Sequence, residues 1–249
     1  ANRLVTYYLK TSRTNIALYE VQNMLKEAQK EDDKTGLSRC YNIMSQIYTI
    51  KRFDSMAFEW RLKEIELTEK YNIENYNISQ TYAQIANYYI SQKKQKEALR
   101  AVEKAISTAN SSTQQISAKL EYVNYYSKFG DFQAAEKILK ECQIAFEQDK
   151  RLESIKKRLY NIECLYYQQT RQYQKALEAA EMQEKEEHRL SESILSSSHY
   201  RTQGEIYQKM GNMNMAVKYL QMYINTDDSL KIANEQVASS EFATLLNVE

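Results

Sequence analysis

The sequence predicts an all-α protein, a right-handed α-solenoid of about six helix hairpins followed by one further helix. Three observations support this prediction. The chain of 249 residues contains no proline and only 4 glycines, too few for the tight turns that sandwiches, barrels and doubly wound sheets need. Of its 21 tyrosines, six recur at a spacing of about 40 residues along the chain. Each of these six is followed nine residues later by an alanine.

The first helix of each predicted hairpin carries the recurring tyrosine and a mostly small residue three positions before it. The tyrosines are Tyr8, Tyr48, Tyr89, Tyr126, Tyr167 and Tyr207. The residues three positions before them are Val5, Ser45, Ala86, Val123, Cys164 and Gly204. Steps of three and four residues bring side chains onto one face of a helix. The small residue lets a partner helix approach, and the tyrosine fills the space beside it.

The second helix of each hairpin begins after a short link that is polar or contains glycine. The links at 91–95, 128–131 and 209–212 suit the turn of an antiparallel helix pair. The alanines fall early in the second helices, where they pack closely against the first helices. They are Ala17, Ala57, Ala98, Ala135, Ala176 and Ala216. Stacked hairpins of this kind contact mainly their neighbours, and the predicted solenoid covers residues 1–226.

This order of aromatic, small, Tyr, Gly and Ala residues resembles the tetratricopeptide repeat. The best match within the chain is Tyr200, Gly204, Tyr207, Gly211 and Ala216. The usual period is about 34 residues, so the longer spacing predicts helices that are longer by about a turn. The proline that commonly closes each repeat is absent. The resemblance implies that the first helices line a concave surface.

Residues 227–249 are predicted to form a separate linking helix that caps the last hairpin in part and continues past the end of the chain. Asp227, Asp228 and Ser229 are typical of a helix N-cap. Apolar residues then recur at helical spacing. They are Leu230, Ala233, Val237, Ala238, Phe242 and Leu245.

A second resemblance rests on Tyr223, Asp228, Ser229 and Leu230, which directly follow the last repeat. Repeats of this spacing with this ending are similar to the sensor regions of Bacteroidetes-type sensor histidine kinases and helix-turn-helix regulators. The resemblance implies a two-component-type receptor whose sensor lies on the periplasmic side of the inner membrane. It also implies that a membrane helix and an output domain belong to the same polypeptide, outside this chain.

Composition and residue spacing argue against several other functions. The 34 basic and 33 acidic residues leave a formal net charge of +1, which does not attract nucleic acid. His188 lies in a charge run typical of a solvated helix face, and His199 is expected on the surface or in packing. Cys40, Cys142 and Cys164 lack the spacing of a metal or redox site, and the last two are expected to be buried. We therefore predict no enzyme, cofactor or metal.

The predicted concave face is rich in amides, which donate and accept hydrogen bonds and so suit an extended peptide backbone. Its arginines suit a carboxylate. The candidate ligand-binding residues are Asn42, Gln46, Gln80, Asn87, Asn124, Arg158, Asn161, Gln168, Arg201 and Glu205. Any wet helix face also carries such residues, so the prediction concerns the surface as a whole.

The leading functional prediction is a non-catalytic sensor that binds a peptide or protein along its concave face and passes a change in curvature to an output domain through the tail helix. The alternative is a cytoplasmic peptide-responsive regulator or interaction scaffold. Peptide receptors of Gram-positive quorum sensing also use long tetratricopeptide repeats with asparagines on their inner faces. An enzyme would need a catalytic cluster assembled across several repeats.

Overall fold

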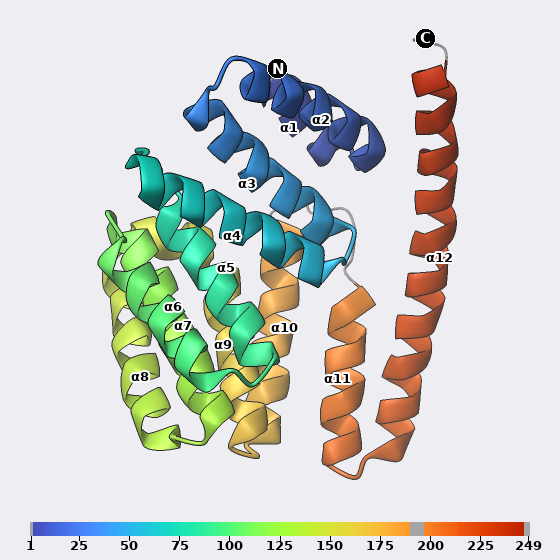
Figure 1. Cartoon of the computed structure of the whole chain (residues 1–249). Helices are drawn as coiled ribbons and strands as arrows, with labels where there is room; N and C mark the ends of the chain where they lie inside the picture. The colour runs from blue at the N-terminus through green and yellow to red at the C-terminus, as the bar shows by residue number, and fades with distance from the viewer. Residues whose placement is uncertain (1, 190–196, 247–249) are drawn as a thin grey trace.

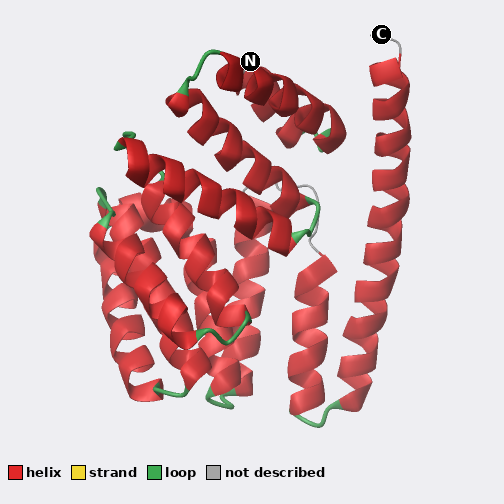
Figure 2. Cartoon of the chain, viewed as in Figure 1, coloured by secondary structure: helices red, strands yellow, loops and turns green. Residues whose placement is uncertain are grey.

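The computed structural model describes residues 2–189 and 197–246, and within these ranges the chain is helical and contains no strand (Figure 2). In chain order the helices are α1 (Asn2–Lys10), α2 (Thr14–Lys30), α3 (Lys34–Ile50), α4 (Asp54–Tyr71), α5 (Ile78–Ser91), α6 (Gln95–Ser107), α7 (Ser112–Phe129), α8 (Phe132–Gln148), the 3-10 helix η1 (Lys150–Ile155), α9 (Lys156–Gln169), α10 (Tyr173–Arg189), α11 (Ser197–Lys209) and α12 (Met213–Leu246).

Consecutive α-helices pair into antiparallel hairpins that stack one upon the next (Figure 1). We call them hairpin 1 (α1 and α2) to hairpin 6 (α11 and α12). The predicted α-solenoid of six hairpins is confirmed. No helix in the described ranges combines the length and the apolar character that crossing a membrane requires.

The predicted packing positions form the core of each hairpin. The alanines nine residues after the recurring tyrosines are 0–2% exposed. The small residues three positions before those tyrosines are all buried, and the tyrosines themselves are half-buried. In hairpin 6 the fit is tight, because a Cβ on Gly204 would lie 2.9 Å from Cγ of Leu220. Only glycine allows α11 and α12 to approach this closely.

Each recurring tyrosine also closes the turn of its hairpin through its backbone. Its carbonyl oxygen accepts a hydrogen bond from the backbone N–H five residues later, at 2.8–3.0 Å in all six hairpins. The residue four positions after the tyrosine has a positive φ between 57° and 91°. This is the geometry of a helix C-terminus that ends in a left-handed residue. The repeat therefore specifies the turn as well as the packing.

The predicted helix start at residues 227–229 is wrong, because α12 runs without interruption from Met213 to Leu246. Side chains satisfy the polar cluster inside the helix. Asp227 forms an ion pair with Lys231 one turn later, at 3.0 Å. The Ser229 hydroxyl donates to the carbonyl of Asn225 at 2.9 Å. Residues 247–249 of the predicted linking helix lie outside the described residues.

The cysteines and His199 are packing residues. Cys40, Cys142 and Cys164 are free thiols and 0–2% exposed, as predicted for the last two. His199 is 5% exposed, and its Nε2 lies 3.1 Å from Oε1 of Glu184 on α10. The side chain of His188, expected on a solvated face, lies outside the described residues.

Candidate ligand-binding groove

A continuous groove runs along the first helices of hairpins 1 to 5. It consists of four hollows that share lining residues. Asn42 and Gln46 line both a hollow of about 700 Å³ and a neighbouring one of about 60 Å³. Gln80 joins the small hollow to one of about 470 Å³, and Gln84 joins it to a side hollow of about 270 Å³. We refer to the four together as the groove.

The N-terminal part of the groove lies between α1, α3 and the loop 72–77. Leu9 and Ile43 give it an apolar wall, and Lys10 and Arg39 line it with positive charge. Among the described residues neither cation pairs with a carboxylate. This part of the groove therefore combines apolar surface with two available cations.

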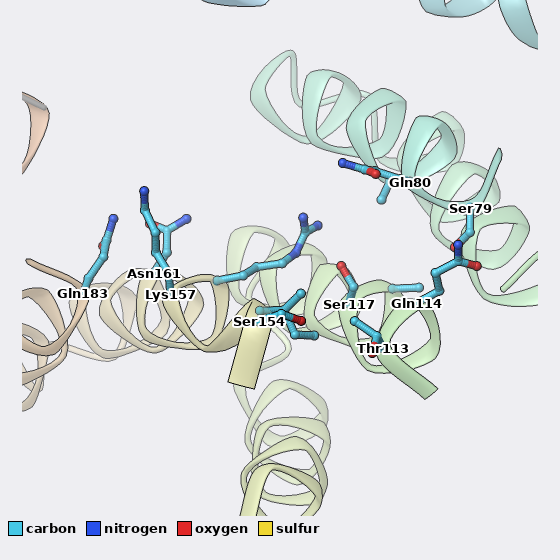
Figure 3. A pocket seen from close by; sticks show the side chains of 13 residues that line it. Ser79, Gln80, Thr113, Gln114, Ser117, Ser154, Lys157, Asn161 and Gln183 are labelled. Atoms are coloured by element: carbon cyan, nitrogen blue, oxygen red, sulfur yellow. The ribbon is translucent and has the colours of Figure 1, made fainter. Parts of the chain in front are cut away.

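The far part of the groove is polar and is built by several helices (Figure 3). Gln80 enters it from α5, Ser117 from α7, Lys157 and Asn161 from α9, and Gln183 from α10. None of the described residues that line this hollow is acidic. Its amides and hydroxyls can both donate and accept hydrogen bonds.

Arg158 lines the same hollow and pairs through Nη2 with Glu121 of α7. Glu121 is 1% exposed. Neither Nε of Arg158 nor Oε2 of Glu121 has a hydrogen-bond partner among the described residues. The pair ties α7 to α9 and leaves one donor and one acceptor unsatisfied beside the groove.

Glu64 of α4 is a buried carboxylate at the floor of the N-terminal part, with 1% exposure. It accepts hydrogen bonds from Nδ2 of Asn75 at 2.8 Å, from Nδ2 of Asn42 at 3.1 and 3.2 Å, and from the Thr81 hydroxyl at 3.4 Å. Burial raises the pKa of the Glu64 carboxyl, although these donors and the charge of Arg61 oppose the shift.

Arg61, one turn before Glu64 on α4, reaches the side hollow and is 7% exposed. Its Nε donates to Oε1 of Gln84 at 2.7 Å, and its Nη2 donates to the Thr49 hydroxyl at 2.6 Å. Burial lowers the pKa of this guanidinium from its usual high value. Arg61 and Glu64, both on the second helix α4, thus link the groove-lining helices α3 and α5 through side-chain hydrogen bonds.

The structure brings about half of the predicted binding residues into the groove. Six of the ten line its hollows: Asn42, Gln46, Gln80, Asn87, Arg158 and Asn161. Asn87 lines the side hollow and accepts a hydrogen bond of 2.7 Å from Nδ2 of Asn124. The two amides thus partly satisfy each other.

The other four predicted residues, Asn124, Gln168, Arg201 and Glu205, line none of these hollows. Gln168 accepts a hydrogen bond from Nζ of Lys209 at 3.2 Å. Arg201 pairs with Glu205 within α11 at 2.8 Å. The groove ends at hairpin 5, so inner-face positions of hairpin 6 do not reach it.

Sequence reasoning did not find the charged residues of the second helix α4 or the loop 72–77. Arg61 and Glu64 lie on the buried face of α4 with Ala57, Ile65 and Thr68. The sequence did contain a signal for them, because two ionisable residues fall on a helix face that otherwise carries apolar or small residues. Buried charges require dedicated partners. The loop carries no comparable signal, since its position depends on the left-handed Asn72, which has a φ of 47°.

The lining of the groove carries groups that suit non-covalent binding. The described residues contain no group of His, Cys, Asp and Glu that could hold a metal ion. The groove offers amides, hydroxyls, cations and apolar wall, the groups that recognise a peptide backbone, its carboxylates and its apolar side chains.

No family model and no curated protein matches the sequence. The structure is similar to PilW, a widely conserved type IV pilus biogenesis factor, with a TM-score of 0.56, 16% identity and coverage of 90% of each chain. It is similar to a Rap protein complexed with competence and sporulation factor, with a TM-score of 0.59, 14% identity and coverage of 98% of this chain and 72% of that one. BtubC from P. vanneervenii matches with a TM-score of 0.53, 14% identity and coverage of 88% and 92%. These similarities show a helical solenoid of the tetratricopeptide type.

Proposed function

We propose that the chain is a non-catalytic interaction module that binds an extended peptide or protein segment in the groove. The observation that carries this proposal is the continuity of the four hollows through Asn42, Gln46, Gln80 and Gln84. A long groove with an apolar wall at one end and a polar lining at the other suits an extended chain better than a single small molecule. The Rap protein, crystallised with competence and sporulation factor, has the same kind of fold.

We further propose that the module is the input region of a signalling receptor. The resemblance of Tyr223, Asp228, Ser229 and Leu230 to the end of Bacteroidetes-type sensor regions supports this role. So does α12, one continuous helix that contacts both α11 and α2. Binding in the groove transmits a signal only if the ligand prefers one curvature of the solenoid over another. The sensor would lie on the periplasmic side of the inner membrane.

A cytoplasmic peptide-responsive regulator is the second candidate. The similarity to the Rap protein over 98% of this chain favours it. Protease treatment of intact and permeabilised cells separates the two locations. Digestion of the chain in cells with a permeable outer membrane and an intact inner membrane supports the periplasmic sensor, and protection there supports the cytoplasmic regulator.

The groove is tested by selecting peptides from a random phage-displayed library on the purified protein. Gln80 and Asn161 are exposed groove residues that make no hydrogen bond among the described residues. The double change Gln80→Ala and Asn161→Ala should therefore leave helicity unchanged. We expect it to weaken binding of the selected peptides by about tenfold, which corresponds to two lost hydrogen bonds of about 0.7 kcal/mol each.

Gln208→Ala is the matched control, because Gln208 is an exposed amide on the first helix of hairpin 6, outside the groove. It should leave affinity unchanged. Peptides that bind the double variant as tightly as the wild type would show that the groove is not their site.

A further inference from the structure

Residues 228–246 of α12, here called the strap, return to the start of the solenoid. Hairpin 6 is formed by α11 and the first half of α12, and the strap extends beyond α11 towards hairpin 1 (Figure 1). There Glu241 accepts hydrogen bonds from the backbone N–H of Asn15 at 3.1 Å and of Ile16 at 3.3 Å. It also accepts one from Nδ2 of Asn15 at 2.7 Å.

Glu241 supplies an N-terminal cap that α2 lacks. Arg13, the N-cap residue of α2, makes no capping hydrogen bond through its side chain, and the first turn of α2 contains no acidic residue. A carboxylate at this place satisfies free N–H groups and interacts favourably with the helix dipole. The cap is therefore provided from 226 residues away in the chain.

The strap is attached through one buried carboxylate and a half-buried apolar face. Glu241, with 2% exposure, is its one described residue that is fully buried. Ile232 and Phe242 are each 58% exposed, and Leu246 is 73% exposed. Leu230, Val237, Ala238 and Leu245 lie on the same face as Glu241 and are half-buried. Because no described apolar side chain of the strap is fully buried, its release costs far less than unfolding a hairpin.

Two further polar contacts lie at the seam, one between hairpins 1 and 2 and one between hairpin 2 and the residue before the strap. Nζ of Lys51 donates to Oδ1 of Asn15 at 2.6 Å, which orients the amide that Glu241 accepts from. Nη1 of Arg52 lies 3.7 Å from Oδ1 of Asp227, just before the strap. The contacts of Glu241 and Asp227 depend on how far hairpin 6 lies from hairpins 1 and 2.

We propose that the strap is a reversible latch: closed, it joins the two ends of the solenoid into a ring through the Glu241 cap on α2, and it opens as a unit when hairpins 1 and 6 move apart. The latch stands whether or not a peptide binds the groove. If one does, a change in curvature opens or closes it, and the free strap is then a helix with both apolar and polar faces available to a partner.

Hydrogen exchange tests the latch in the whole chain. In the wild type, strap amides should exchange through a local opening whose rate changes little in low urea. In Glu241→Ala we expect the amides of the strap and of Asn15 and Ile16 to exchange at least tenfold faster. The amides of α5 and α7 should keep their protection. Glu235→Ala is the matched control, because Glu235 is exposed on the same helix.

A distance measurement provides the second readout. The three native thiols are buried, so spin labels at Lys26→Cys on α2 and Gln236→Cys on the strap attach selectively to exposed positions. We expect one dominant distance in the wild-type background and a broad, longer distribution with Glu241→Ala. Identical distributions in the two backgrounds, a strap that is already broad in the wild type, or loss of protection throughout the chain would each overturn the proposal.

Discussion

Glu64 and Glu241 are carboxylates buried to nearly the same extent, 1% and 2% exposed, yet they stabilise very different parts of the fold. Glu64 binds donors that lie 11 to 22 residues away in the chain, within the stack of hairpins 2 and 3. Glu241 binds donors 225 and 226 residues away, where the last helix meets the second.

The difference separates two levels of organisation. Contacts such as those of Glu64 join neighbouring hairpins, as contacts within a solenoid generally do. The contact of Glu241 depends on the curvature accumulated over all six hairpins, which no single repeat specifies. The first kind stabilises the groove, and the second closes the ring.

The largest effect is expected at Arg158, where a contact between neighbouring hairpins crosses the groove wall. Arg158→Met leaves Glu121 buried without its partner, and loss of one member of a buried pair costs about 3 kcal/mol. Urea unfolding should show this as a lower midpoint. Arg158→Met with Glu121→Leu should recover most of the stability, because the isolated buried charge is then absent. A double variant as unstable as the single one would contradict this explanation.

The second effect is a pH dependence at Glu64. Burial raises the pKa of this carboxyl in the folded state, so its contribution to stability is complete below the unfolded pKa of about 4.3 and is lost as the pH rises through the folded pKa. The wild type should therefore lose stability through this group as the pH rises above the unfolded pKa of about 4.3, measured by urea unfolding. Glu64→Gln should flatten that loss.

Glu163 of α9 provides an independent second test of this pH dependence. Burial also raises the pKa of its carboxyl, against a hydrogen bond donated by Gln143. Glu163→Gln should flatten the curve by a separate increment that adds to that of Glu64, since the two carboxyls share no partner. An unchanged slope in Glu64→Gln would show that the carboxyl is not shifted upwards.

The residue pattern predicted the packing because packing depends on periodicity. A tyrosine and an alanine nine residues apart specify the two faces of a hairpin and its turn, and all six hairpins have them. The same register predicted that Asn42 and Gln80 lie on the inner face, and both line the groove.

The pattern did not predict where the groove ends. Arg201 and Glu205 occupy inner-face positions like those of Asn42 and Gln46, but they belong to hairpin 6 and pair with each other. Curvature, the loop 72–77 and η1 decide which inner faces converge. These depend on the whole stack, and so does the Glu241 contact.

The smallest effect is expected at the turns between the two helices of a hairpin. There a turn with lysine at the left-handed position can be compared with a turn that has glycine. The residue four positions after the recurring tyrosine is left-handed in every hairpin, with φ of 57° at Lys93 and 91° at Gly130. A left-handed conformation costs a residue with a Cβ about 1–2 kcal/mol. Glycine avoids this strain, but it loses more conformational entropy on folding, which offsets part of the gain. Lys93→Gly should therefore raise the free energy of unfolding by about 0.5–1 kcal/mol, and Gly130→Ala should lower it by a similar amount.

Nothing lies within 4 Å of a Cβ at Gly130, so a loss of stability there would come from the backbone alone. Opposite signs in thermal or urea unfolding would establish that the turns at Lys93 and Gly130 share one left-handed conformation, and equal signs would show that they do not.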